Sequence, residues 1–257
     1  MAKKQTNMNE DRFCGMAAVY DQYRPGYPDA LIDYLFDAAG LSAESRAADI
    51  GAGTGIWSEM LLRRGCAVVC VEPNDDMRAL ADEKLTQYSG FISVGAPAEH
   101  TTLEDASVDL ITVAQAFHWF AETAFRAEAA RILRPGGKAA LIWNSRKTPD
   151  AFTDENRALC ETHCPDFKGF SGGQTQNKRA FASFFKDGEC TLKVFDNPQR
   201  YDLAAFIGRH LSASYAPKES HPAHAPFVRD LTALFEKHSR GGIITMPCDT
   251  RCFLGGV

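Results

Sequence analysis

Apolar positions alternate between helix-like and strand-like spacing from residue 28 to residue 143. Helical spacing is seen over 28–40, in a segment that ends at Gly65, and over 75–88 and 122–133. Between these segments lie short apolar runs at 46–50, 67–71, 91–94, 108–114 and 138–143. Strands that alternate with helices are typical of α/β proteins, so we expect a parallel sheet.

The alternation ends after residue 145. A polar, glycine-containing stretch with two helix-like pieces predicts an insertion, and residues 189–201 predict a sixth strand. Residues 203–214 and 227–238 have the spacing of amphipathic helices, and residues 243–254 predict a final strand. We expect the last two strands to form a hairpin-like antiparallel edge.

Composition excludes several classes of protein. The 257 residues carry 28 Lys and Arg against 33 Asp and Glu, a net charge of −5, so a non-specific nucleic-acid binder is disfavoured. No apolar run approaches the roughly 18 residues that span a bilayer, and the first twelve residues lack an apolar signal core. We therefore expect a cytoplasmic protein that binds small molecules and not membranes, as a monomer or homodimer.

The eight cysteines predict free thiols in such a protein. Three pairs share a four-residue offset, and the Cys-x-x-Cys spacing of metal sites does not occur. Cys160, His163 and Cys164 offer three zinc ligands without a recognisable fourth, so we expect no metal site.

The first candidate for chemistry is the glycine loop Asp49-Ile50-Gly51-Ala52-Gly53-Thr54-Gly55, between a predicted strand and a predicted helix. Open parallel sheets bind ligands at this position, although a plain tight turn is the structural alternative. A dinucleotide fingerprint requires a third glycine where Ile56 stands. The carboxylate of Asp49 would repel a pyrophosphate and attract an ammonium or sulfonium group, and S-adenosylmethionine carries both.

Further cofactor candidates follow the next two strands. Glu72 ends the second strand 21 residues after Gly51, where a carboxylate can accept both hydroxyls of a ribose. Ala98 and Glu99 follow the third strand, where they can meet an adenine edge. Met77 can cover the adenine ring or belong to the core.

Four segments together resemble the class I S-adenosylmethionine-dependent methyltransferases: ADIGAGTG, VEPNDDM, VDLITVAQAFHWF and RILRPGGKAALIWNSR. They resemble most the small-molecule branch that includes trans-aconitate-methyltransferase-like proteins. The resemblance implies a Rossmann-like, seven-stranded, mostly parallel sheet with helices on both faces, an antiparallel last strand and a helical lid. It also implies one domain over 1–257, with a cofactor-binding half at 1–145 and the insertion, lid and last two strands at 146–257.

The resemblance assigns cofactor contacts by position. Asp49, Gly51 and Gly53 are placed at the methionine end and Gln115 beside the reacting sulfonium. The full predicted cofactor set is Tyr20, Asp49, Gly51, Ala52, Gly53, Glu72, Pro73, Met77, Ala98, Glu99 and Gln115. Many relatives have an Asp where this chain has Pro97, which leaves the adenine hydrogen bond the least secure assignment.

The predicted substrate side begins at His118 and Trp119, which follow the fourth strand. His118 is a candidate catalytic base or a structural histidine, and Trp119 a candidate pocket wall. Arg24, with Tyr20, precedes the first helix and is a candidate contact for the methionine carboxylate or for an acidic substrate. Tyr215 is assigned to the predicted lid.

The leading hypothesis is a methyltransferase with a small-molecule acceptor, for which a carboxylic acid is one candidate. The alternatives are a non-catalytic protein of the same fold that binds the nucleoside cofactor, and a nicotinamide-dependent oxidoreductase, which Ile56 and Asp49 disfavour. A nucleic-acid methyltransferase is disfavoured by the acidic charge and by AQAFHW at the end of the fourth strand.

Overall fold

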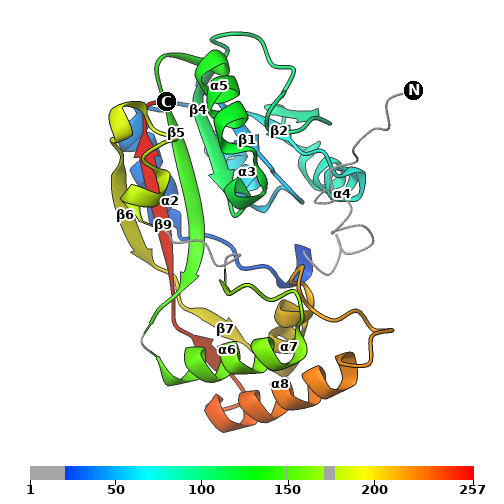
Figure 1. The fold of residues 1–257 in the computed structure, drawn as a ribbon. Helices are drawn as coiled ribbons and strands as arrows, with labels where there is room; N and C mark the ends of the chain where they lie inside the picture. The colour runs from blue at the N-terminus through cyan, green and yellow to red at the C-terminus, as the bar shows by residue number, and fades with distance from the viewer. Residues whose placement is uncertain (1–20, 149, 171–176) are drawn as a thin grey trace, which may run out of the picture.

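The computed structural model describes residues 21–148, 150–170 and 177–257. Seven strands form one sheet in the order β3-β2-β1-β4-β5-β9-β6 (Figure 1). β1 to β5 are parallel, and β9 runs antiparallel to both β5 and β6, which confirms the predicted fold class. The strands are β1 Arg46–Ile50, β2 Ala67–Val71, β3 Phe91–Val94, β4 Val108–Ala114, β5 Leu133–Arg146, β6 Thr191–Asp196 and β9 Cys248–Gly255.

Helices cover both faces of this sheet because alternate side chains of each buried strand point to opposite faces. Val68 and Cys70 of β2 join one apolar cluster, whereas Val69 and Val71 join the other. The first cluster is covered by α2 Asp29–Ala39, α3 Ile56–Arg63 and α4 Asp75–Leu85. The second is covered by α5 Glu122–Ile132, by the short turn Lys178–Phe181 and by Phe184 and Phe185, which follow this turn.

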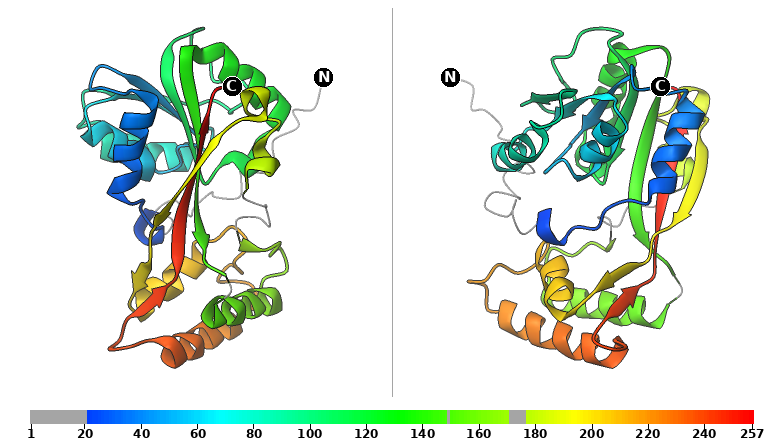
Figure 2. Two further views of the ribbon diagram at one scale, coloured as in Figure 1. Left: turned by 90° about the vertical axis from the view of Figure 1, so that its left-hand side faces the viewer. Right: turned by 180° about the vertical axis from the view of Figure 1, so that it is seen from behind.

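A separate group of elements lies beyond the carboxyl end of β5 (Figures 1 and 2). We call it the lid module, and it has its own apolar cluster around Phe206, Phe227 and Leu231. It consists of α6 Ala151–His163, α7 Leu203–Leu211, α8 His224–His238 and a two-stranded sheet of β7 Gln199–Tyr201 and β8 Ile244–Met246. Figure 2 shows β6 and β9 running from the main sheet into this module.

Both of the predicted C-terminal strands are divided, which corrects the sequence-based boundaries. The run 189–201 forms β6 and β7, and the run 243–254 forms β8 and β9. Each break contains a proline, Pro198 in the first and Pro247 in the second, and proline has no N–H for a strand ladder. Each divided run therefore contributes one strand to the main sheet and one strand to the lid module.

The fifth strand is longer than the predicted 138–143, because it begins at Leu133 and continues to Arg146. Its pairing with β4 is irregular between Val108 and Leu110, where the Arg134-Pro135-Gly136-Gly137 segment is accommodated. β9 lies between β5 and β6 and pairs antiparallel with both, so β9 and β6 form the antiparallel edge that the sequence predicts. In the described part of the chain, no helix is long and apolar enough to cross a membrane.

Candidate functional site

A cavity of about 500 Å³ opens at the carboxyl edge of the sheet. The order of the strands reverses between β1 and β4, and open α/β sheets bind ligands at this switch point. Gly51, directly after β1, and Gln115, directly after β4, both line the cavity. Its far side is formed by lid-module residues that include Arg209 and Tyr215. The cavity therefore lies between the sheet edge and the lid module.

The three glycines of the loop all have a positive φ, but only one faces open space. A Cβ on Gly51 would lie 2.6 Å from the Cβ of Ala116, and a Cβ on Gly55 would lie 2.5 Å from Leu85. A Cβ on Gly53, whose φ is +57°, would meet nothing within 4 Å. Packing thus requires Gly51 and Gly55 to be glycine, and Gly53 is left as the position where a ligand can approach the backbone.

Glu72 holds the glycine loop to the next loop of the sheet edge. Its two carboxylate oxygens accept hydrogen bonds from the Gly53 N–H at 2.8 Å and the Asn74 N–H at 2.9 Å. A carboxylate has about four lone-pair sites, and Glu72 also lines the cavity. Such an acceptor fits the two hydroxyls of an unphosphorylated ribose, which would donate to it, as the sequence predicts.

Asp49 is almost fully buried, with 1% of its surface exposed. Its carboxylate accepts hydrogen bonds from the hydroxyls of Ser58 at 2.5 Å and Thr112 at 3.0 Å. Burial raises the pKa of Asp49 to about 6, while these two bonds act to lower the pKa. Asp49 also lines a small cavity of about 40 Å³ beside Gly51, Ala52 and Gly53. The structure therefore gives it a role in tying β1 to α3 and β4 from beneath the loop.

The raised pKa of Asp49 has a stability consequence. The native state binds a proton more readily than the unfolded chain between pH 3.8 and about 6, so wild-type stability falls as pH rises through this window. We expect Asp49→Asn to raise the unfolding free energy at about pH 8 by up to the order of 3 kcal/mol, less the hydrogen bonds it weakens. The gain should vanish near pH 4. Urea unfolding at both pH values measures it, with the exposed Asp37→Asn as control.

The predicted adenine end is assembled at the other side of the cavity, where Pro73, Met77, Pro97, Ala98 and Glu99 all contribute to the lining. Met77 is 3% exposed, so it serves the core of α4 and the cavity wall together. One oxygen of Glu99 accepts a 2.6 Å hydrogen bond from the N–H of Ala121, at the start of α5. A hydrogen bond from an adenine amino group to the Glu99 carboxylate stays a prediction.

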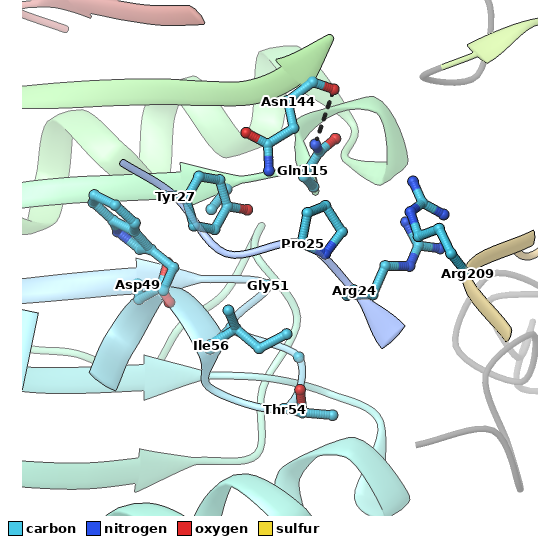
Figure 3. Close-up of a pocket in the computed structure, with 14 residues that line it drawn as sticks. Arg24, Pro25, Tyr27, Asp49, Gly51, Thr54, Ile56, Gln115, Asn144 and Arg209 are labelled. Atoms are coloured by element: carbon cyan, nitrogen blue, oxygen red, sulfur yellow. Dashed lines mark hydrogen bonds between the residues drawn. The ribbon is translucent and has the colours of Figure 1, made fainter. Parts of the chain in front are cut away.

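Gln115 adopts a left-handed backbone with φ +60°, which is unusual for a residue other than glycine. Its backbone N–H donates to Ile142 and its side-chain amide donates to the carbonyl of Asn144 at 3.2 Å. These two hydrogen bonds to β5 hold the strained backbone conformation and keep Gln115 at the edge of the cavity. Figure 3 shows Gln115 and Asn144 joined beside the glycine loop.

The segment 24–27 crosses this edge of the sheet. Asn144 and Asn197 donate to the carbonyl of Gly26, and the ring of Tyr27 packs edge-on against Trp57 with centroids 5.1 Å apart. Arg24 donates to the carbonyl of Ser212 at 3.0 Å, at the end of α7. Figure 3 shows Arg24 and Arg209 entering the same small cavity. Tyr20, the other predicted contact here, lies outside the described residues.

His118 and Trp119 lie in a single turn, Phe117–Trp119, and line the cavity. Burial and then the charge of Arg24 lower the pKa of His118 to about 4. Its Nδ1 is buried and has no hydrogen-bond partner in the described part of the chain. The ring is therefore neutral at pH 7, and its buried Nδ1 has no partner among the described residues.

The sequence interpretation missed Asn144, Arg146 and Arg209, which also line the cavity. Arg146 is the last residue of β5, so it reaches the carboxyl edge of the sheet only because that strand is longer than predicted. Arg209 lies in the last turn of α7, in the half that matches the family motifs loosely. In the described residues, no group of three or more His, Cys, Asp or Glu side chains is arranged to hold a metal ion.

The architecture is the Rossmann-like fold of the methyltransferases, as two solved structures show. A protein named as a candidate type II methyltransferase, from Anaeromyxobacter dehalogenans, superposes with a TM-score of 0.70 at 22% identity, over 91% of this chain and 98% of that one. A SAM-dependent methyltransferase from Aquifex aeolicus superposes with a TM-score of 0.53 at 17% identity, over 71% and 92%. The shared fold includes both the sheet and its flanking helices.

Residues 48–141, from β1 to β5, match the family model of the methyltransferase domain. An uncharacterized methyltransferase from Mycobacterium tuberculosis is 40% identical over 134 residues, 52% of each chain. Another from Schizosaccharomyces pombe is 32% identical over 145 residues, 56% of this chain and 57% of that one. The chain thus spans about half the length of the curated relatives it matches.

Proposed function

We propose that this protein is an S-adenosylmethionine-dependent methyltransferase with a small-molecule acceptor. The observation that carries the proposal is the pairing of Glu72 with the open Gly53 position at the edge of the cavity. This pair offers a ribose acceptor and an approachable backbone within the segment that matches the methyltransferase domain. Buried Asp49 fixes the same loop from below and adds negative charge near the methionine end.

When bound, S-adenosylmethionine supplies a methyl group, and the carbon–sulfur bond leaves its electron pair on sulfur as the acceptor's nucleophilic atom bonds the methyl carbon. The protein's part is alignment and exclusion of water. Gln115 and Asn144 fix the sheet edge beside the reacting position, and Trp119 and the lid module form the opposite wall. A carboxylate acceptor carries no proton at the attacking oxygen, so it requires no base.

A carboxylic acid acceptor and the trans-aconitate-methyltransferase-like branch belong to the same proposal, as do a cytoplasmic location and a single domain. The support for an acidic acceptor is the basic side of the cavity, beginning with Arg24. The size of the cavity supports a small acceptor, because the same volume of about 500 Å³ includes the end assigned to the nucleoside and leaves only part of it for the acceptor.

A methyl-transfer assay tests the proposal directly. Purified protein is incubated with S-adenosylmethionine labelled in its methyl group and with a panel of organic acids, alcohols and amines. We expect saturable binding of S-adenosylhomocysteine by calorimetry and labelled product from an acid. Absence of binding would exclude the proposal, and binding without transfer to any acceptor would support the non-catalytic alternative. Binding of reduced nicotinamide cofactor in its place would favour the oxidoreductase.

The charge state of His118 gives a prediction that needs no acceptor. Because its pKa is about 4, the ring should stay neutral and show no titration between about pH 5.5 and pH 8.5. The measurement is an NMR titration of the imidazole resonances, with His118 assigned by its loss in His118→Asn. A midpoint near 6.5 for that resonance would contradict the buried, Arg24-facing environment and would restore His118 as a base suited to neutral pH.

A further inference from the structure

Charge is distributed unevenly along the large cavity. Glu72 and Glu99 line the end assigned to the nucleoside, whereas three arginines, Arg24, Arg146 and Arg209, line the wall toward the lid module. Asp166 and Lys168, both exposed, also line the cavity and carry opposite charges. The lid side is therefore net positive, in a chain whose total charge is −5. Such a local excess of positive charge favours an anionic ligand.

Two of these arginines lack a counter-charge. In the described part of the chain, neither Arg146 nor Arg209 forms an ion pair. The ion pairs of the sheet and of the lid module involve other basic residues. The Nε of Arg146 is buried and has no hydrogen-bond partner among these residues. Its guanidinium lies 3.5 Å from the centre of the Phe170 ring, a contact that orients it without neutralising it.

Arg146 and Arg209 are close enough for their charges to affect the same neighbouring groups. The charge of Arg209 adds to burial in lowering the pKa of Arg146, and both arginines act against the burial that raises the pKa of Tyr215. The other ionisable neighbours of Arg146 are the thiols of Cys160 and Cys248. Burial raises the pKa of the Cys248 thiol and of the Tyr215 phenol, so neither supplies a full negative charge at pH 7. The pKa of Cys160 is lowered, first by its hydrogen bond with Cys164.

Arg146 and Arg209 are partly buried, and a guanidinium withdrawn from water without an anion is costly to the folded protein. Guanidinium groups bind carboxylates through paired, charge-assisted hydrogen bonds, and two of them converge here on the wall of an open cavity. We propose that Arg146 and Arg209 bind a carboxylate of the methyl acceptor, which makes the acceptor a small organic acid. The identification of the bound acid as the methyl acceptor rests on the proposed function, whereas the binding of a carboxylate by the two arginines does not.

The test uses succinate as probe and its uncharged isostere succinamide as the matched ligand, with and without S-adenosylhomocysteine. We expect succinate to raise the midpoint of thermal unfolding in a saturable manner and succinamide to have no effect. Arg146→Met and Arg209→Met should each weaken succinate binding about tenfold or more. Arg229→Met removes an exposed arginine of α8 and should leave binding unchanged. Equal binding of succinate by Arg146→Met, or of succinamide by the wild type, would overturn the proposal.

Stability without ligand separates a binding role for Arg146 from a structural one. If the guanidinium is kept for an anion, Arg146→Met should unfold at the wild-type midpoint or above it, because a partly buried charge without a carboxylate partner is removed. A clearly lower midpoint would show that Arg146 supports the fold and would count against the proposal. Arg146→Lys should retain part of the succinate affinity, since it keeps the charge and loses the planar fork.

The outcomes also distinguish this proposal from the proposed function. Failure of S-adenosylhomocysteine to bind, with succinate binding that depends on Arg146 and Arg209, would reject the methyltransferase and retain the anion site. Normal binding of S-adenosylhomocysteine, with no succinate binding, would do the reverse. Inorganic phosphate serves as the competing anion, and binding of phosphate in place of succinate would reject a carboxylate ligand.

Discussion

Glu72→Gln should reduce the affinity for S-adenosylhomocysteine by about a hundredfold or more. The carboxylate accepts hydrogen bonds from the N–H groups of Gly53 and Asn74 and lines the cavity. An amide replaces one oxygen by an NH₂ group, which faces one of those N–H donors and can no longer accept a ribose hydroxyl. Hydrogen bonds to a charged group contribute about 1.5–3 kcal/mol each. Weaker hydrogen bonds to the two ribose hydroxyls therefore account for a loss of affinity of about a hundredfold.

Calorimetric titration of S-adenosylhomocysteine measures this effect, and Glu83→Gln is the matched control because Glu83 is an exposed carboxylate on the adjacent helix α4. Thermal unfolding without ligand shows whether the loop itself has changed. An affinity within threefold or so of the wild type for a stably folded Glu72→Gln protein would remove Glu72 from the cofactor site.

The cofactor half of the fold was predictable because its buried strands are short, apolar and separated by glycine turns. β1, β2, β3 and β4 have the predicted boundaries. The C-terminal half was not predictable to the same extent, because β6 and β9 are each joined through a proline to a strand of a second, small sheet. The residues on both sides of Pro247 have the apolar pattern of a strand. This pattern does not indicate whether the two strands belong to one sheet or to two.

The candidate site shows a similar division. Glu72, Gly53 and Gln115 follow strands whose ends the sequence locates, and the structure brings them to one cavity. Asp49, which the sequence places at the methionine end, lines the smaller cavity, and its two oxygens accept hydrogen bonds from Ser58 and Thr112. Its contact with the cofactor stays a prediction. Arg146 and Arg209 could not be selected, because they are 63 residues apart and only the placement of α7 brings them together.

Gly53→Ala should separate cofactor binding from folding more cleanly than any other change in the loop. The new Cβ meets no protein atom within 4 Å, so the folded state bears only the strain of alanine at φ +57°, about 1–2 kcal/mol. The same methyl group occupies the space through which a ligand reaches the loop backbone. Crowding of this kind costs about 1–3 kcal/mol, so we expect S-adenosylhomocysteine to bind about tenfold to a hundredfold more weakly.

Gly241→Ala is the matched control, since Gly241 has φ +58° and its Cβ would also meet nothing within 4 Å. Urea unfolding should show similar losses of stability for both variants, and calorimetry should show weaker cofactor binding only for Gly53→Ala. Gly51→Ala adds the opposite case, because its Cβ would lie 2.6 Å from that of Ala116 and should destabilise the fold itself. If Gly53→Ala and Gly241→Ala bound S-adenosylhomocysteine equally well, the cofactor would not approach the loop at Gly53, and the proposed orientation of the site would be wrong.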